Sequence, residues 1–346
     1  MPQPEAQLLW QAADLRRMTV SESGEVLTLT AEQWHRIPFS RLHRIDSKTG
    51  AARQLAKLWL IKPTAIAWSE EHRCCAIAYN GLLLPSTTSV GGLLLARLSP
   101  QLALVLQLKF LIQLLAGWGA ILALILESLL ASITTPGSVR KRVRFLIEDF
   151  QRRASEKLNN RGFGRYWSWP TFVQIESPYD NGSPPRLLVA TATGLFQGIW
   201  GQYPHQFEEI QCGLMNCVHF SSVAAKPDEF LVCEGYLHYP NLYSQGRGLG
   251  AIWRWKRKEN SWTLVRGFLA GASAATHAPD DDSAFVFIAS VGGGVSTAWR
   301  CGGGQAPPIL LAGLNQPEQV ETLPDGSLLV RDRDGLKRLI FSAPTQ

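Results

Sequence analysis

The chain has 346 residues, of which 46% are hydrophobic and 18% charged, so it can bury a large core and is not globally disordered. Its six cysteines form no C-x-x-C pair, which argues against a zinc ribbon or a small disulfide scaffold. The N-terminus has no apolar signal segment, and reduced thiols in a reducing compartment are expected.

A repeated pattern of an apolar strand, a polar turn and a more hydrophobic strand runs through most of the chain. Its six copies span residues 16–30, 64–79, 171–192, 216–235, 273–290 and 318–332. Their starts are separated by about 48, 107, 45, 57 and 45 residues, and removing the segment 101–165 from the long interval leaves about 42. A period near 45 residues is typical of a β-propeller blade.

These observations predict an all-β fold, a six-bladed β-propeller closed by an N-terminal strand, with an inserted apolar helical hairpin. The apolar segment at 6–12 is expected to complete the last blade, whose own strands end within 335–343. The propeller would then comprise residues 1–100, with the closing strand and blades 1 and 2, and 166–346, with blades 3–6. Residues 101–165 form the insert. A pair of β-sandwiches is the competing fold.

The last copy, QPEQVETLPDGSLLVRDRDGLKRLI at 316–340, resembles blades of the six-bladed superfamily that includes gluconolactonases, strictosidine synthases, paraoxonases and NHL-repeat proteins. The resemblance implies a fold and no single activity, because one propeller fold hosts many functions. Paraoxonases are similar in a further respect, since they carry hydrophobic helices that attach a propeller to lipid, although at other positions in the chain.

Residues 101–133 are the most apolar stretch, and Lys109 is the only formal charge between Arg97 and Glu127. Leu102 to Leu126 is long enough to span a bilayer if Lys109 snorkels or faces protein. A second interpretation breaks the segment at Gly117-Trp118-Gly119, giving two short helices that form a shallow hairpin or lie in the membrane interface. A third is a buried hairpin of a soluble domain, or an oligomerisation helix.

A basic segment follows the apolar one. Between residues 138 and 166 there are nine Arg or Lys and three acids, an excess equal to the whole chain's net charge of +6. Anionic lipid attracts such residues, whereas aromatic residues are not interleaved with them, which argues against nucleic acid. If the segment spans, the positive-inside rule places the following residues, and the propeller with them, on the cytoplasmic side. The expected membrane-binding residues are Leu111, Leu114, Trp118, Leu122, Leu126, Arg140, Lys141, Arg142, Arg144, Trp167 and Trp169.

Alignment of the six copies predicts which residues line the central channel. The ring is Thr19, Ala67, Gln174, His219, His277 and Thr322. It contains no acid, and the calcium-dependent lactonases that share this fold need carboxylate ligands, so no metal and no cofactor is expected. Glu321 lies one residue from the ring and enters it if the register shifts.

His219, His277 and Glu321 are the candidate catalytic residues. Two neighbouring histidines suit a transition metal with open positions or acid–base chemistry, although no third metal ligand is apparent. The resemblance to strictosidine synthases implies a glutamate of the last blade as acid or base, and Glu318 and Glu321 lie in the corresponding blade.

Two functions are therefore carried forward. The first is a membrane-associated propeller that acts as a binding or scaffold subunit of a membrane complex, with membrane lipid and a protein as partners. The alternative is a metal-independent lyase, cyclase or hydrolase that acts on a lipophilic substrate.

Overall fold

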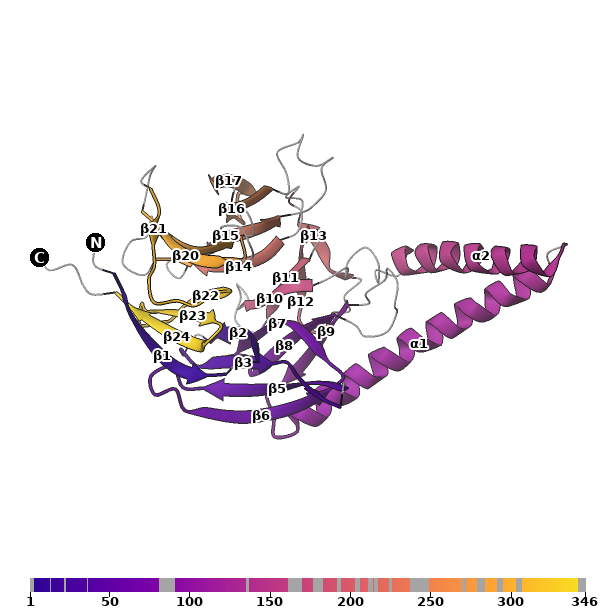
Figure 1. Ribbon diagram of the computed structural model, residues 1–346, viewed down its shortest axis with the longest axis horizontal. Coiled ribbons are helices and arrows are strands. Elements are labelled where there is room, and N and C mark those ends of the chain that lie inside the picture. The colour runs from indigo at the N-terminus through magenta and orange to yellow at the C-terminus, as the bar shows by residue number, and fades with distance from the viewer. Residues whose placement is uncertain are drawn as a thin grey trace, which may run out of the picture.

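The computed structural model describes residues 3–341 except 13, 22, 36, 81–90, 135–136, 161–169, 177–182, 192–193, 203–205, 211–213, 215–216, 224–225, 237–248, 268, 270–271, 279–283, 291–294 and 303–306. The described residues form six antiparallel β-sheets and two long α-helices (Figure 1). The protein is an all-β six-bladed propeller, as the repeats predict.

Blades 1 to 3 have the following strands. Blade 1 contains β2 (Leu15–Val20), β3 (Val26–Thr30), β5 (Ile37–Ile45) and β6 (Ala52–Trp59), with β4 (Glu32–Trp34) also paired to β5. Blade 2 contains β7 (Lys62–Ser69), β8 (Cys74–Asn80) and β9 (Gly91–Arg97). Blade 3 contains β10 (Pro170–Glu176), β11 (Arg186–Thr191), β12 (Gly194–Ile199) and β13 (Glu208–Ile210).

Blades 4 to 6 each have four strands among the described residues. Blade 4 contains β14 (Cys217–Val223), β15 (Lys226–Tyr236), β16 (Leu249–Lys256) and β17 (Ser261–Arg266). Blade 5 contains β18 (Ala274–His277), β19 (Phe285–Ser290), β20 (Ser296–Cys301) and β21 (Ile309–Leu310). Blade 6 contains β22 (Gln319–Thr322), β23 (Leu328–Asp332), β24 (Gly335–Ile340) and β1 (Glu5–Gln11).

Each of the six sequence copies forms the two innermost strands of one blade. The first strands β2, β7, β10, β14, β18 and β22 contact one another in chain order, and β22 also contacts β2, so they surround a central channel. The second strands are buried on both faces between neighbouring blades; β3 and β23 are buried at every residue. Burial on both faces explains why the second strand of each copy is the more hydrophobic.

The first strand of the chain lies beside the last. β1 pairs antiparallel with β24, from Glu5 opposite Ile340 to Gln11 opposite Gly335. Gln3 continues the contact onto blade 5, because its side chain donates to the Leu310 carbonyl at 3.0 Å and accepts from the Ala312 N–H at 3.3 Å. β1 thus covers an edge of β24 that would otherwise expose unpaired backbone groups.

The two helices follow blade 2 and extend away from the ring (Figure 1). They are α1 (Leu102–Thr134) and α2 (Val139–Asn160). The predicted break at Gly117-Trp118-Gly119 is wrong, because α1 continues through these residues for 33 residues in total. Glycine costs only about 1 kcal/mol in a helix interior, so two glycines alone do not end α1, which continues to Thr134. Gly137 has a φ of +139°, and Ser138 accepts the first α2 hydrogen bond, from the Arg142 N–H at 3.1 Å.

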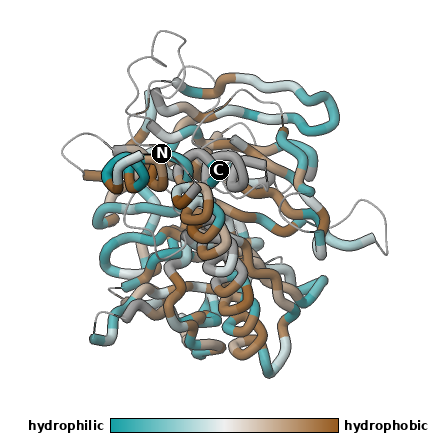
Figure 2. The backbone as a smooth tube through the Cα atoms, turned by 90° about the vertical axis from the view of Figure 1, so that its right-hand side faces the viewer, coloured by the Kyte–Doolittle hydropathy of each residue, from teal (hydrophilic) through white to brown (hydrophobic). Residues whose placement is uncertain are grey.

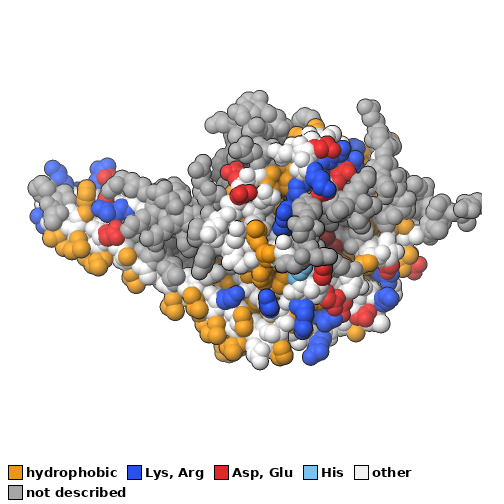
Figure 3. Space-filling view, turned by 180° about the vertical axis from the view of Figure 1, so that it is seen from behind, with side chains coloured by type: hydrophobic (Ala, Val, Ile, Leu, Met, Phe, Trp, Pro, Cys, Tyr) orange, Lys and Arg blue, Asp and Glu red, His pale blue; other side chains and the backbone are white. Residues whose placement is uncertain are grey.

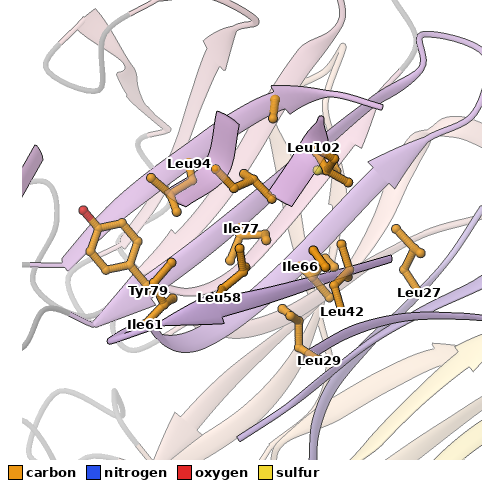
Figure 4. Packing of buried hydrophobic residues seen from close by; sticks show 14 of the residues in the cluster. Leu27, Leu29, Leu42, Leu58, Ile61, Ile66, Ile77, Tyr79, Leu94 and Leu102 are labelled. Carbon is orange, nitrogen blue, oxygen red and sulfur yellow. The ribbon is translucent and has the colours of Figure 1, made fainter. Parts of the chain in front are cut away.

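The first turns of α1 are part of the propeller core. Leu102, Leu106 and Phe110 are buried against residues of blades 1 and 2, including Leu58 and Ile77. Figure 4 shows Leu102 pointing into the same cluster as Leu58 and Ile77. Blade 2 has three strands in the described residues where the other blades have four or more, and α1 packs beside its outer strand β9. The hairpin therefore leaves the ring at the outer edge of blades 1 and 2.

Candidate functional site

A cavity of about 430 Å³ occupies one end of the central channel. Every innermost strand contributes to its wall, through Thr19, Ala67, Gln174, Ser221, Thr276 and Thr322. Phe172, Phe220 and Trp68 add aromatic surface, and Glu321 is the only carboxylate among the described lining residues. A wall that combines hydroxyl groups, aromatic rings and one acid suits a small ligand with both polar and apolar parts.

The structure places four of the aligned ring residues, Thr19, Ala67, Gln174 and Thr322, on this wall. In blades 4 and 5 the positions expected for histidine are taken by Ser221 and Thr276. β14 has register shifts between Cys217 and His219 and between Ser222 and Val223, and the side chain that reaches the cavity is Ser221, two residues after His219. His277 follows Thr276 directly, and consecutive side chains of a strand point to opposite faces. The structure does not bring the two histidines together on the cavity wall.

His219 instead forms a buried contact with the predicted acid. Its side chain is 2% exposed, and Nε2 lies 3.3 Å from Oε1 of Glu321 in blade 6. The Ala275 N–H donates to Nδ1 at 3.5 Å, and with Nδ1 as the acceptor the N–H at Nε2 points to the carboxylate. The ring packs against Phe172, with centroids 4.4 Å apart.

Glu321 is held by a second donor and faces the cavity. The Gln319 amide donates to Glu321 Oε1 at 3.1 Å and to the Met18 carbonyl at 2.7 Å, and it accepts from the Met18 N–H at 3.2 Å. These bonds join blade 6 to blade 1. With two donors on one oxygen, Glu321 is a positioned carboxylate that can accept a hydrogen bond from a ligand or exchange a proton with it.

Hydroxyl groups complete the wall on the side of blades 5 and 6. The hydroxyls of Thr276 and Thr322 are 2.7 Å apart, and Thr322 also donates to the His277 carbonyl at 3.2 Å. Glu318, the other acid considered in blade 6, forms an ion pair with Arg331 and does not line the cavity. Within the described part of the chain, no group of three His, Cys, Asp or Glu residues is arranged to hold a metal ion.

The polar residues of α1 bind the outer strands of two blades. Gln107 accepts from the Trp59 N–H at 2.8 Å and donates to the Trp59 carbonyl at 3.2 Å, at the end of β6. On another side of the helix, Lys109 donates to the Leu95 carbonyl and Gln113 to the Leu93 carbonyl, both on β9. Lys109 therefore faces protein, and the base of α1 is fixed between blades 1 and 2.

The remaining faces of α1 carry two runs of exposed aliphatic side chains, which we together call the α1 stripe. Within each run, Leu104 to Leu115 and Leu122 to Ile133, successive members are at most four residues apart, and they are 36% to 70% exposed. Most side chains between the two runs are outside the described set. The members of the stripe are Leu104, Leu108, Leu111, Ile112, Leu115, Leu122, Ile125, Leu126, Leu129, Leu130 and Ile133. The hydrophobic colouring of much of α1 is visible in Figure 2.

The predicted membrane-binding residues divide into three groups. Leu111, Leu122 and Leu126 belong to the α1 stripe. Leu114 and Trp118 lie on α1, but their side chains are outside the described set, and Trp167 and Trp169 lie outside the described residues. Arg140, Lys141, Arg142 and Arg144 are exposed in the first turns of α2, where Arg144 pairs with Glu148 at 2.9 Å.

Polar groups lie inside the helix pair. Asp149 and Ser128 are buried, and Arg153 of α2 bonds both Asp149 at 2.6 Å and Glu127 of α1 at 3.4 Å. A helix pair in water normally buries its apolar residues and exposes its polar ones, whereas here Asp149 and Ser128 are buried and the residues of the α1 stripe are exposed. Among the helices of the described residues, none is both long and apolar enough to cross a membrane.

Comparison with known proteins supports the fold. The structure of a GH74 enzyme from Niastella koreensis matches 93% of this chain with a TM-score of 0.52 at 9% identity. Weaker matches include TolB from Acinetobacter baumannii, with a TM-score of 0.45, 7% identity and 94% of this chain covered. The WD40 β-propeller domain of Doa1 matches 99% of this chain and 97% of its own, with a TM-score of 0.43 at 10% identity.

These likenesses extend to the fold alone. This chain spans 44% of the GH74 enzyme and 54% of TolB. No protein-family model and no curated protein matches the sequence. The superfamily suggested by the last blade therefore remains a resemblance, and function has to be argued from the channel and the hairpin.

Proposed function

We propose that this protein is a membrane-associated β-propeller that attaches through the α1–α2 hairpin and acts as a binding or scaffold subunit of a membrane complex. The observation that carries the proposal is the α1 stripe. Soluble monomers rarely expose contiguous apolar patches of more than a few hundred Å², and this stripe follows a helix of 33 residues, about 50 Å long.

The burial of Asp149 between the helices, together with the exposure of the α1 stripe, favours lipid as the neighbour of the stripe. In a bilayer, charged side chains face protein and aliphatic ones face lipid, which is how Asp149 and Arg153 are arranged relative to Leu122 and Leu126. A helix that lies in the interface needs one apolar face and nearby cations for anionic headgroups. Arg140, Lys141 and Arg144 of α2 supply these cations.

In this arrangement α1 lies along the membrane surface with the stripe in the acyl boundary, and the ring stays in the aqueous phase. We place the ring on the cytoplasmic side, because its five described cysteines are all buried and none is joined to another by a disulfide, and reduced thiols are typical of reducing compartments. The rims of the blades then remain available to a protein partner, as in other propeller scaffolds.

Flotation of the full-length protein with vesicles containing phosphatidylserine tests this proposal. The test variant replaces three stripe residues, Leu115→Gln, Leu122→Gln and Leu126→Gln. The matched control replaces three similarly exposed aliphatics of the blades, Leu264→Gln, Ile309→Gln and Leu310→Gln, which are 42% to 51% exposed.

We expect the natural chain and the blade variant to float and the stripe variant to partition at least ten-fold less. Circular dichroism and thermal unfolding check that each variant is folded. Absence of flotation by the natural chain, or equal flotation by the stripe variant, overturns the proposal.

The channel supports a second candidate, a metal-independent hydrolase or lyase acting on a lipophilic substrate. The supporting observation is the His219–Glu321 contact beside a cavity with three aromatic residues. Hydrolysis of p-nitrophenyl butyrate in the presence of EDTA tests the hydrolase form, with Glu321→Gln as the active-site variant and Glu318→Gln as its control. If the Glu321→Gln variant retains turnover, or if the natural chain shows none, the hydrolase candidate is excluded.

A further inference from the structure

A cluster of aromatic and basic residues lies where α1 leaves the ring. We call it the blade-1 patch; it consists of Trp34 on β4, Phe39 and Arg41 on β5, and Lys57 and Trp59 on β6. Trp34 is 55% exposed and meets Trp59 edge-on, with ring centroids 6.0 Å apart. Trp59 in turn packs against Phe39 at 5.3 Å.

The blade-1 patch has two cations, Arg41 and Lys57, and one of them is paired with a described carboxylate. Lys57 and Arg41 are directly opposite each other in the β5–β6 register, a placement of like charges that is unfavourable. Arg41 pairs with Glu32 at 3.1 Å. The Lys57 ammonium has no described carboxylate within 4 Å and lies over the Phe39 and Trp59 rings, 4.3 and 4.2 Å from their centroids. The patch thus carries one uncompensated positive charge beside exposed aromatic surface.

The position of the patch ties it to the α1 stripe. Trp59 is the residue whose backbone is bonded by Gln107, and Gln107 is flanked on α1 by the stripe residues Leu104 and Leu108, 59% and 49% exposed. Figure 3 shows hydrophobic side chains along the lower edge of the hairpin and continuing onto the ring. Tryptophan beside cations and an aliphatic surface is the composition of a membrane-interface contact.

We propose that the blade-1 patch is a phospholipid headgroup site that seats the ring on the bilayer. Lys57 and Arg41 bind the lipid phosphate, and Trp34 and Trp59 lie between the headgroups and the acyl chains. This inference rests on the proposed function, because the patch meets lipid only if the hairpin does. A headgroup site at the blade-1 patch fixes the orientation of the ring on the membrane. The outer edge of blade 1 contacts the bilayer, and blade 4, which is opposite in the ring, faces away from it.

The test compares vesicle partition of two double variants of the full-length chain. Lys57→Gln with Arg41→Gln removes the patch cations, and Lys48→Gln with Arg53→Gln removes the same charges from the opposite end of the β5–β6 hairpin. With vesicles containing phosphatidylserine, we expect the patch variant to bind roughly 25-fold more weakly, about five-fold per cation, and the control less than three-fold. Equal losses in the two variants overturn the inference.

A second readout separates a lipid contact from a free-anion site and from a structural role. Brominated lipids should quench the natural chain's fluorescence more than that of Trp34→Phe, because Trp34 is placed at the acyl boundary. Inorganic phosphate at constant ionic strength should leave vesicle binding unchanged. Equal quenching, or release by phosphate, overturns the headgroup site.

The outcomes distinguish this inference from the proposed function. If the stripe variant detaches while the patch variant behaves like its control, the hairpin binds membrane and the blade-1 patch does not. If the stripe variant remains bound, the proposed function itself fails.

Discussion

The side-chain amide of Gln107 pairs with both backbone groups of Trp59, accepting from its N–H at 2.8 Å and donating to its carbonyl at 3.2 Å. One helical side chain thereby satisfies the backbone of a residue at the end of β6, as a neighbouring strand would. A residue from the inserted helix is thus part of the hydrogen bonding of blade 1.

Gln107→Ala is expected to lower the free energy of unfolding by about 1 to 3 kcal/mol, because it leaves a part-buried N–H and C=O unpaired. Urea unfolding followed by circular dichroism measures the change. Gln101→Ala, at an exposed position just before α1, is the control and should change stability by less than about 0.5 kcal/mol. Equal effects of the two substitutions would contradict a role for the Trp59 contact.

Trp10→Ala is expected to destabilise the ring where β1 meets β24. Trp10 lies opposite Leu336, packs on the core between blades 6 and 1, and contacts the His43 ring at 5.1 Å between centroids. Loss of this aromatic surface should cost about 2 to 4 kcal/mol. The control Trp34→Ala removes an exposed indole and should leave the urea midpoint nearly unchanged; a larger shift for Trp34 than for Trp10 would refute this assignment.

The described cysteines are expected to resist thiol reagents in the folded protein. Cys74, Cys75, Cys217, Cys233 and Cys301 are all buried, and burial raises the pKa of Cys75 to about 12 and also raises the pKa of Cys233. Because the thiolate is the reactive species, Ellman's reagent at pH 8 should modify at most one of the six thiols rapidly, and all six in guanidinium. Two or more fast thiols in the native protein would contradict the packing.

Glu176 is expected to make the free energy of unfolding depend on pH, and the direction of its pKa shift gives the sign. Burial raises its pKa, although Arg257 contacts it at 2.6 Å and acts in the opposite direction. The folded protein therefore holds this proton more tightly than the unfolded chain, whose Glu pKa is near 4.3. Its contribution to stability is full below that value and falls as pH rises through the raised pKa.

The difference in unfolding free energy between the natural chain and Glu176→Gln should consequently be larger near pH 4 than at pH 7. Urea unfolding across this range measures it. A difference that grows with pH would mean that the attraction of Arg257 outweighs burial.

The blade pattern could be predicted from sequence because it is local and repeated. The second strand of each copy is buried on both faces, so segments such as the one containing Leu27 and Leu29 are apolar at nearly every position. The channel ring was less predictable. β14 pairs irregularly with β15 at two places, and Ser221 lines the cavity where His219 was expected; nothing in a single sequence indicates such bulges.

The environment of the polar residues on α1 could not be predicted from helical periodicity. Gln107 lies on a different side of α1 from Lys109 and Gln113, so helical periodicity alone assigns these polar residues no common surface. They are nevertheless all bonded to protein, because the helix base lies between the edges of two blades. The approach of His219 to Glu321 joins residues 102 positions apart, and only the closed ring brings them together.

The place of the hairpin in the chain also orders events during synthesis. β24 begins at Gly335, 201 residues after α1 ends at Thr134, and β1 cannot pair until that strand exists. At 5 to 20 residues per second, α1 is complete roughly 10 to 40 seconds before its ring can close. The aliphatic helix α1 therefore emerges from the ribosome when only blades 1 and 2 have been synthesised. It can contact a bilayer or a chaperone while the rest of the propeller is still being made.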